Sequence, residues 1–376
     1  MKFRCERDDL LNAVQFASRA ISNRATLPVL SGLRIEAGEH GRVSLAATDL
    51  ELTMETSTAA AVDEPGKAIV PGRLFGEMTR SLSAGQVTVA AGDAEVEISS
   101  GRGRFRVKAL APDDYPALPI EDRGSEGASV DITLDGDALA TALSQVVRAA
   151  SADESRQILT GVLWEIDGSK VTLAATDSYR LGVRTLEMPD DTGAQRNVVL
   201  PSRALSELGR ALQAGPSTLR ATVKDNLASF SVGSTEGSDE ATIGSRFIEG
   251  EFPKYRQLLP QGYPNTLEID REALLEVTRR VGLLAQNNLP VKLQLGEELE
   301  VSAHTPDVGE GQEILDADYS GDPLVIAFNP QFLNDGLSAI TSDRVVIEVA
   351  DGLKPAIIRG RDDEAFTYLL MPVRLS

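Results

Sequence analysis

The chain has 376 residues, 42% of them hydrophobic, which predicts two to four domains at roughly 100 to 200 residues each. Its formal net charge of −20, taken alone, argues against nucleic-acid binding, because phosphate binding depends on Lys and Arg. No long apolar run or signal-like start occurs, and the single cysteine, Cys5, excludes an internal disulfide framework, so a cytoplasmic protein is expected.

The first residues predict a short strand followed by an amphipathic helix. Apolar residues such as Leu10 and Val14 recur there at helical spacing, and acidic residues or Arg stand at the helix start. The same pattern returns from Val130 and from Asn265. We therefore expect three equivalent first helices, over residues 7–20, 136–150 and 270–285.

Strand-like sequence follows each first helix and ends twice in the same five residues. "LAATD" spans Leu45 to Asp49 and again Leu173 to Asp177, and a degenerate third copy lies in "LEVSAHTPD" from Leu299. Catalytic aspartates would need a nearby acid, base or metal, and the two histidines offer no ligand spacing. The pattern favours turn-forming aspartates that bond their own backbone at strand ends.

A second helix follows in each copy, after an apolar strand and a proline near the helix entrance. The three segments begin at Ala68, Asn197 and Leu324 and predict helices over residues 73–82, 202–213 and 329–340. Equivalent elements lie roughly 130 residues apart, which is a domain-sized period. Proline-rich segments at 111–129 and 251–265 mark the junctions, so we expect domains at 1–124, 125–253 and 254–376.

The charge is unevenly distributed between the predicted helices and the rest of the chain. The six helices hold ten arginines and nine acidic residues, a net charge of +1, which leaves −21 elsewhere. This is compatible with ordinary helix surfaces, and also with a helix-lined face that tolerates phosphate inside an acidic exterior. No recognition helix or aromatic platform occurs, so such a face would bind weakly and without sequence preference.

A series of short segments carries a family resemblance over the whole length. In chain order they read "MKF", "TLPVLSGL", "LAATDLE", "VPGR", "GRGRFRV", "ATDSYRL", "LPSRAL", "FPKYRQLLP", "QEILDADYSGD", "FNPQFL" and "LLMPVRLS". In this order they resemble the bacterial β sliding clamp family, the processivity subunits of DNA polymerase III. The resemblance implies an α+β fold of three similar DNA-clamp domains, each with two antiparallel sheets outside and two helices inside. It also implies a head-to-tail dimeric ring around duplex DNA.

The resemblance further implies a pocket for partner peptides between the second and third domains. Carried over, it falls on Leu159, Thr176, Ser178, Tyr179, Arg180, Leu181, Pro253, Leu258, Asn329, Phe332, Leu353, Leu369, Leu370, Met371, Pro372, Val373 and Arg374. The family often has Gly-His at Ser178-Tyr179, Tyr at Phe332 and Arg at Gln257. An apolar pocket with a polar rim suits short peptides with Leu and Phe anchors.

Two further sets of residues come from the same resemblance. DNA contacts are expected at Arg24, Arg73, Arg156, Gln157 and Arg203. The ring interface is expected to pair Arg102, Arg104, Phe105 and Val107 of one chain with Leu283 and Leu284 of the other, with Asp307 and Glu310 facing the arginines. Such a contact joins two different patches and closes after two copies.

The expected partners are duplex DNA, a second copy of the chain, the replicative polymerase alpha subunit, the clamp loader, translesion polymerases, DNA ligase and mismatch-repair proteins. No catalytic residue, metal or cofactor is expected, since ATP would serve the loader. Two alternatives remain: an acidic scaffold that binds peptides but never DNA, and a hydrolase that uses Asp49 or Asp177.

Overall fold

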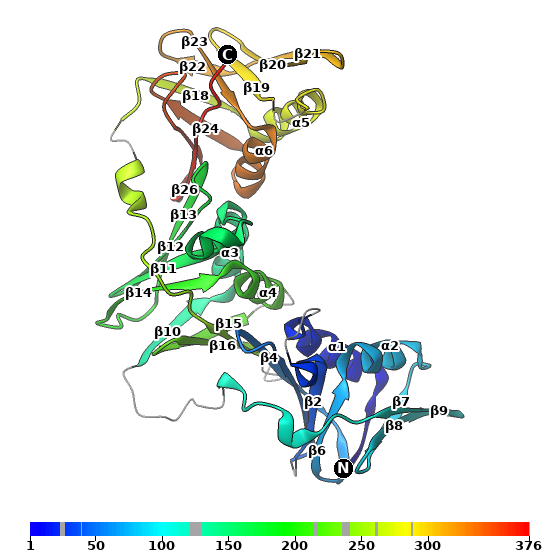
Figure 1. The fold of residues 1–376 in the computed structure, drawn as a ribbon. Coiled ribbons are helices and arrows are strands. Elements are labelled where there is room, and N and C mark those ends of the chain that lie inside the picture. Colours follow the sequence, from blue (N-terminus) through cyan, green and yellow to red (C-terminus); the bar gives the residue numbers. More distant parts are fainter. Residues whose placement is uncertain are drawn as a thin grey trace. The chain divides into compact units, whose positions relative to one another are not determined.

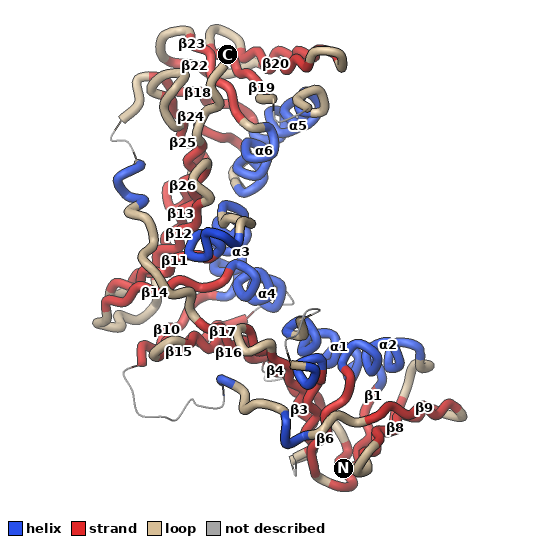
Figure 2. The backbone as a smooth tube through the Cα atoms, in the orientation of Figure 1, coloured by secondary structure: helices blue, strands red, loops and turns tan. Residues whose placement is uncertain are grey.

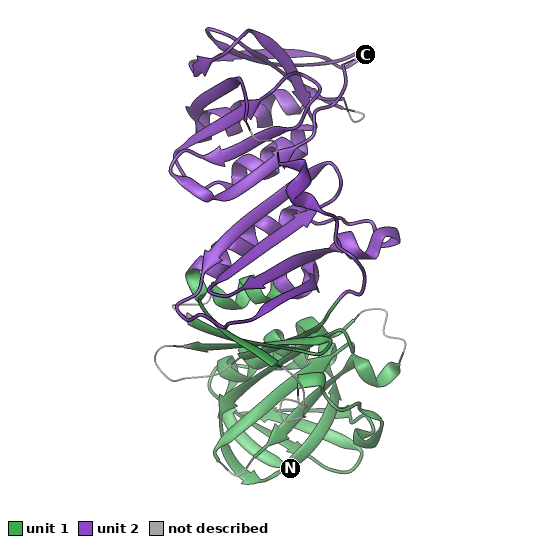
Figure 3. Ribbon diagram, turned by 90° about the vertical axis from the view of Figure 1, so that its left-hand side faces the viewer, with its two compact units in different colours: residues 1–137, 207–247 green, residues 138–206, 248–376 purple. Residues whose placement is uncertain are grey.

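The computed structural model describes residues 1–22, 27–38, 40–120, 129–213, 217–234, 241–259, 262–286 and 289–375 (Figure 1). These residues form two compact units, coloured separately in Figure 3: 1–137 with 207–247, and 138–206 with 248–376. Each unit combines antiparallel sheets with helices, as the predicted α+β class requires (Figure 2). Within the described ranges, no helix has the length and apolar character needed to cross a bilayer.

The first unit holds two antiparallel sheets. One has the order β5 (Ala61–Glu64), β1 (Lys2–Glu6), β7 (Gln86–Ala91), β8 (Glu95–Ser100), β9 (Gly103–Lys108). The other has the order β10 (Ser129–Asp135), β15 (Ser217–Lys224), β16 (Leu227–Ser234), β17 (Ala241–Arg246), β4 (Leu52–Ala59), β3 (Arg42–Thr48), β2 (Gly32–Ala37), β6 (Gly66–Pro71). The helices α1 (Arg7–Ala17) and α2 (Gly72–Ser81) pack against each other.

The second unit also holds two antiparallel sheets. The larger has the order β14 (Gln195–Pro201), β11 (Gly161–Asp167), β12 (Lys170–Thr176), β13 (Arg180–Glu187), β26 (Asp363–Leu370), β25 (Ala356–Gly360), β24 (Arg344–Val349), β18 (Asn265–Asp270), β22 (Asp318–Ser320). The smaller has the order β21 (Gly309–Leu315), β20 (Leu299–Thr305), β19 (Val291–Leu295), β23 (Leu324–Phe328). The helices α5 (Arg271–Gly282) and α6 (Pro330–Ala339) pack together.

Strand order repeats three times in the two units. The sets β4-β3-β2-β6, β13-β12-β11-β14 and β21-β20-β19-β23 have one topology, and β1-β7-β8-β9, β10-β15-β16-β17 and β18-β24-β25-β26 have another. The two large sheets arise because β4 pairs with β17 and β13 pairs with β26. The threefold repeat that the sequence predicts is therefore present as three copies of one strand arrangement.

The six predicted helices are confirmed, although their α-helical parts are shorter. α1 and α3 (Gly136–Val146) each end in a 3₁₀ turn, at Ser18–Ala20 and Val147–Ala149, and α4 covers Ser202–Leu212. Within the observed bounds the helices hold eight arginines and eight acidic residues. Their net charge is thus zero rather than the predicted +1, because Arg19 and Arg148 fall in the 3₁₀ turns and Asp270 is an N-cap.

Candidate docking site

The two "LAATD" copies end in the same turn. In the first, Asp49 Oδ1 accepts hydrogen bonds from the N–H groups of Glu51 and Leu52. In the second, Asp177 Oδ1 accepts from Tyr179 and Arg180 at 2.9 and 3.0 Å. The prediction that these aspartates form turns is confirmed, since each carboxylate holds the backbone that starts the next strand.

The residues after the turn make the second copy different. Tyr179 is 61% exposed, and its ring stacks on that of Phe332 with centroids 6.3 Å apart. Arg180 is buried, and its guanidinium bonds the carboxylates of Asp177 and Asp335. Burial opposes the positive charge, but contacts with Tyr368, Asp335 and Asp177 raise the pKa of Arg180 above its usual value. Arg180 therefore stays charged and joins β13 to α6.

Phe332 is positioned by the start of α6. The Asn329 side chain accepts hydrogen bonds from the N–H groups of Gln331 and Phe332, which is an N-cap. The hydroxyl of the fully buried Tyr368 donates to the carbonyl of Phe332 at 2.9 Å. A Cβ added at Gly336 would lie 2.4 Å from the Tyr368 ring, so glycine lets β26 approach the helix closely. The helix start is fixed from both sides.

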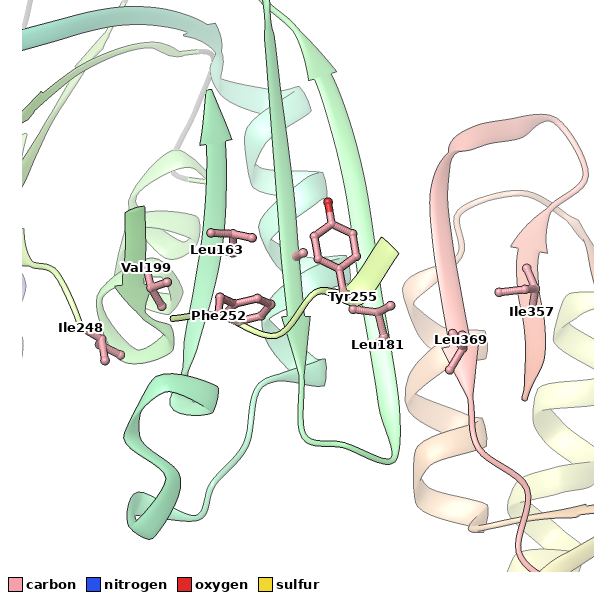
Figure 4. Close-up of a cluster of buried hydrophobic side chains, with 9 residues drawn as sticks. Leu163, Leu181, Val199, Ile248, Phe252, Tyr255, Ile357 and Leu369 are labelled. Atoms are coloured by element: carbon pink, nitrogen blue, oxygen red, sulfur yellow. The ribbon is translucent and has the colours of Figure 1, made fainter. Parts of the chain in front are cut away.

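A buried apolar cluster lies on the face of the β13–β26 pair that is turned away from Arg180 and Tyr368 (Figure 4). Leu181 and Leu369 face each other in register and belong to it. Sequence reasoning placed these two residues in the pocket, but it missed the other members, which are Leu163, Ala174, Val199, Ile248, Phe252, Tyr255 and Ile357. The alternation of Phe252 and Tyr255 with exposed residues in "EFPKYRQ" was the available signal.

Several predicted pocket residues leave apolar surface uncovered around this strand pair. Leu258, Leu353 and Met371 are exposed, and the Met371 N–H donates to the Tyr179 carbonyl at 2.9 Å. Leu353 is displayed by a turn in which Asp351 accepts from two backbone N–H groups. We refer to Tyr179, Leu258, Phe332, Leu353 and Met371 as the docking surface.

The remaining predicted pocket residues lie around or away from this surface. Leu159, Thr176 and Leu370 are buried, whereas Ser178 and Pro253 are exposed. Past Pro372, the Val373 N–H donates to the Ala327 carbonyl at 2.8 Å. Val373 and Arg374 line a separate hollow over the outer face of β19 and β20. The predicted set therefore divides between the docking surface, its buried support and this second hollow.

The predicted DNA contacts have different surroundings. Arg73 is highly exposed on α2, with Glu77 at 3.4 Å. Arg156 donates to Ser178 Oγ at 2.9 Å and pairs with Asp153, so it braces the turn beside the docking surface. Gln157 and Arg203 are exposed. Arg24 lies outside the described residues.

The predicted ring residues lie on the edge strand β9 or in the turn before it, and directly after α5. Phe105 and Leu283 are exposed, Leu284 is half-buried, and Arg102 and Arg104 are exposed. Val107 is only 6% exposed, because its side chain is buried in the core of its own unit. Its side chain therefore has little area left for a partner.

Comparison with known proteins gives matches over the whole length. Three family models match in order: the DNA polymerase III beta subunit N-terminal domain at residues 1–119, its central domain at 133–254 and its C-terminal domain at 256–374. A beta sliding clamp of Streptomyces coelicolor is 36% identical over 384 residues, covering 100% of both chains. One of Staphylococcus aureus is 33% identical over 387 residues, covering 100% of this chain and 99% of that protein.

Solved structures agree with these matches. A DNA polymerase sliding clamp of Bacillus subtilis superposes with a TM-score of 0.91 at 28% identity, with 100% of both chains covered. A sliding clamp of Pseudomonas aeruginosa bound to griselimycin gives 0.91 at 26% identity, again with 100% of both chains covered.

Proposed function

The chain belongs to the DNA polymerase III beta subunit family and is a sliding clamp of DNA replication without catalytic activity, and we propose that two copies close head to tail around duplex DNA. In this assembly the polymerase is held on DNA by topological linkage rather than by tight contact. The interior then needs only weak, sequence-independent contacts, which fits helices of zero net charge in a chain of −20.

The docking surface carries the second part of the proposal. Tyr179, Leu258, Leu353 and Met371 are large apolar side chains left exposed around one strand pair, beside a rigidly held Phe332. Exposed apolar side chains gathered at one place mark binding sites. We infer that this surface binds short linear peptides of the replicative polymerase alpha subunit, the clamp loader, translesion polymerases, DNA ligase and mismatch-repair proteins.

We further propose that the chain divides into three domains, at residues 1–124, 125–253 and 254–376. Peptides would bind where the second and third domains share the β13–β26 pair. Griselimycin, which binds the Pseudomonas aeruginosa clamp, is a suitable competitor for this surface.

Duplex DNA is proposed to contact the exposed Arg73, Gln157 and Arg203, together with Arg24 and Arg156. Arg156 bonds Ser178 and Asp153 and is less exposed than Arg73, which pairs with Glu77, so the share of Arg156 in phosphate binding is expected to be smaller. Replacing an arginine that binds a phosphate should reduce the salt dependence of DNA binding.

Retention on circular DNA tests the proposal. After loading by a clamp loader with ATP, the protein should stay on nicked circular DNA in high salt and leave when the circle is cut. Salt weakens ionic contacts but not topological linkage, so only an encircling protein behaves this way. Equal retention on circles and linear DNA, or on neither, would contradict the ring and favour the scaffold alternative.

A further inference from the structure

A segment of the second unit, residues 248–259, crosses one face of the large sheet and carries part of the docking surface. The Ile248 N–H donates to the Val199 carbonyl at 2.8 Å, which ties the start of the segment to β14. Phe252 and Tyr255 then pack into the buried apolar cluster on this face (Figure 4). Leu258 follows them and is 51% exposed. We refer to residues 248–259 as the linker.

The turn that presents Leu258 is short. It is a 3₁₀ turn over Tyr255–Leu258, in which the Gln257 N–H donates to the Lys254 carbonyl at 3.1 Å. The next residue, Leu259, is half-buried against the apolar cluster. Because 3₁₀ hydrogen bonds have poor geometry, such a turn depends on contacts outside itself. The contacts between the linker and the sheet therefore decide where the Leu258 side chain points.

One carboxylate of the sheet binds two consecutive side chains of this turn. Glu165 lies on β11 two residues after Leu163, so it faces the same side of the sheet as the apolar cluster. Its Oε2 atom accepts from the Tyr255 hydroxyl and from the Arg256 guanidinium, each at 2.5 Å. Burial, together with the hydrogen bond to Glu165, raises the pKa of Tyr255, so the hydroxyl stays a donor. Glu165 is therefore the polar anchor of the turn.

The equivalent carboxylate of the first unit has a different partner. β2 and β11 occupy the same place in the repeat, and each starts its pairing with a glycine opposite a proline. Four residues later, Glu36 lies opposite Lys67, and the two side chains form an ion pair at 3.0 Å. In the second unit Glu165 lies opposite Asn197, which carries no charge. The carboxylate that pairs within its own sheet in the first unit binds the linker in the second.

The segment that follows β9 in the first unit shows the same contrast. Its Leu118 and Ile120 pack on Ala46 of β3 and are only 1% and 2% exposed. These side chains cover apolar surface of their own unit. Leu258 of the linker instead leaves apolar surface open beside the docking surface residues Leu353 and Met371, which are also exposed. The added anchor at Glu165 therefore occurs in the repeat whose linker presents an exposed leucine.

Resting on the proposed docking surface, we propose that Glu165 is a positioning residue for peptide binding, which holds Tyr255 and Arg256 so that Leu258 is presented to the peptide. Glu165 acts through Leu258 and does not itself contact the peptide. A side chain that is ordered before binding loses less conformational entropy when the peptide binds, so the anchored turn increases the affinity. The peptides that gain from it are those with a bulky apolar side chain to set against Leu258.

Peptide affinity in the full chain tests the positioning role. Glu165→Ala removes the acceptor of both side chains, and we expect it to lower the affinity for a labelled peptide with Leu and Phe anchors about fivefold. Glu165→Gln should retain most of the affinity, because an amide oxygen still accepts from the Tyr255 hydroxyl. Glu36→Ala, at the equivalent position of the first unit, is the matched control and should bind normally. Equal affinity losses in Glu165→Ala and Glu36→Ala, or none in Glu165→Ala, would overturn the proposal.

A double-mutant cycle shows whether Glu165 acts through Leu258. Leu258→Ala removes the side chain that is positioned, so adding Glu165→Ala to it should lower the affinity little further. Tyr255→Phe keeps the ring in the apolar cluster and removes only the hydroxyl, and it should show the same dependence on Leu258. This second variant keeps the test open if Glu165→Ala does not fold. Losses that multiply in the double variants would show that Glu165 and Leu258 act independently, which overturns the proposal.

The same measurements separate the positioning role from the docking surface itself. If Leu258→Ala lowers the affinity and neither Glu165→Ala nor Tyr255→Phe does, the docking surface stands and the positioning role is wrong. If Leu258→Ala binds the peptide normally, the placement of the peptide on this surface is wrong, and the positioning role is wrong with it. Coupled losses in folded variants, with normal binding by Glu36→Ala, support both.

Discussion

The guanidinium carbon of Arg180 lies 4.4 Å from the centroid of the Phe332 ring. Its nitrogens bond Asp177, which shapes the turn before β13, and Asp335, which lies on α6. One buried cation therefore connects the turn that carries Tyr179 with the helix that carries Phe332. The aromatic pair of the docking surface is held by this connection, in addition to its own stacking.

Replacing Arg180 should lower the free energy of unfolding more than replacing an exposed arginine does. Arg180→Met would leave the buried Asp177 and the partly buried Asp335 without their cation, and we expect a loss of about 2 to 4 kcal/mol in the free energy of unfolding. Urea denaturation measures it. Arg156→Met is the control, because its exposed pairs should contribute less than about 1 kcal/mol. Equal losses in both variants would contradict the connecting role.

The two turn aspartates should differ in their contribution to stability. Asp177→Asn keeps an acceptor for the turn but loses the charge that faces Arg180, so we expect a loss of about 1 to 3 kcal/mol. Asp49→Asn should cost less than about 1 kcal/mol, since an amide oxygen can still accept from the backbone N–H groups of Glu51 and Leu52. Thermal unfolding compares them. A hydrolytic activity abolished by either change would instead support a catalytic role.

Deleting Pro372 to Ser376 should abolish peptide binding and leave the dimer. The deletion removes the hydrogen bond from the Val373 N–H to the Ala327 carbonyl. This bond fixes the chain just after Met371, which belongs to the docking surface. A labelled peptide with Leu and Phe anchors, followed by fluorescence anisotropy, measures affinity, and sedimentation measures the dimer. Unchanged peptide affinity would show that residues 372–376 do not contribute to the binding site.

Leu258→Ala gives a milder test of the same surface. Leu258 is exposed in the free protein, so we expect peptide affinity to fall about tenfold while the melting temperature stays unchanged. Leu181→Ala, on the buried support, should lower both quantities. A Leu258 variant that binds normally would place the peptide elsewhere.

The sequence predicted the repeat, the helices and the turn role of Asp49 and Asp177, because these depend on local periodicity and on hydrogen bonds within a few residues. It did not predict that β13 pairs with β26, since pairing between strands nearly 190 residues apart leaves no local pattern. For the same reason the sequence could not show that Arg156 bonds Ser178 or that the Val107 side chain is buried.

Charging the two leucines that follow α5 should open the proposed ring. Leu283 is 74% exposed, as the proposed interface requires, and Leu284 lies against Gly311 on the β21 edge. Leu283→Asp with Leu284→Asp would place two carboxylates at the proposed interface, where their burial against Phe105 of a second copy becomes unfavourable. We expect monomers in sedimentation velocity at concentrations where the parent chain is dimeric. Peptide affinity at the docking surface should be retained, which shows that the monomer is folded, and a dimer of undiminished stability would place the interface elsewhere.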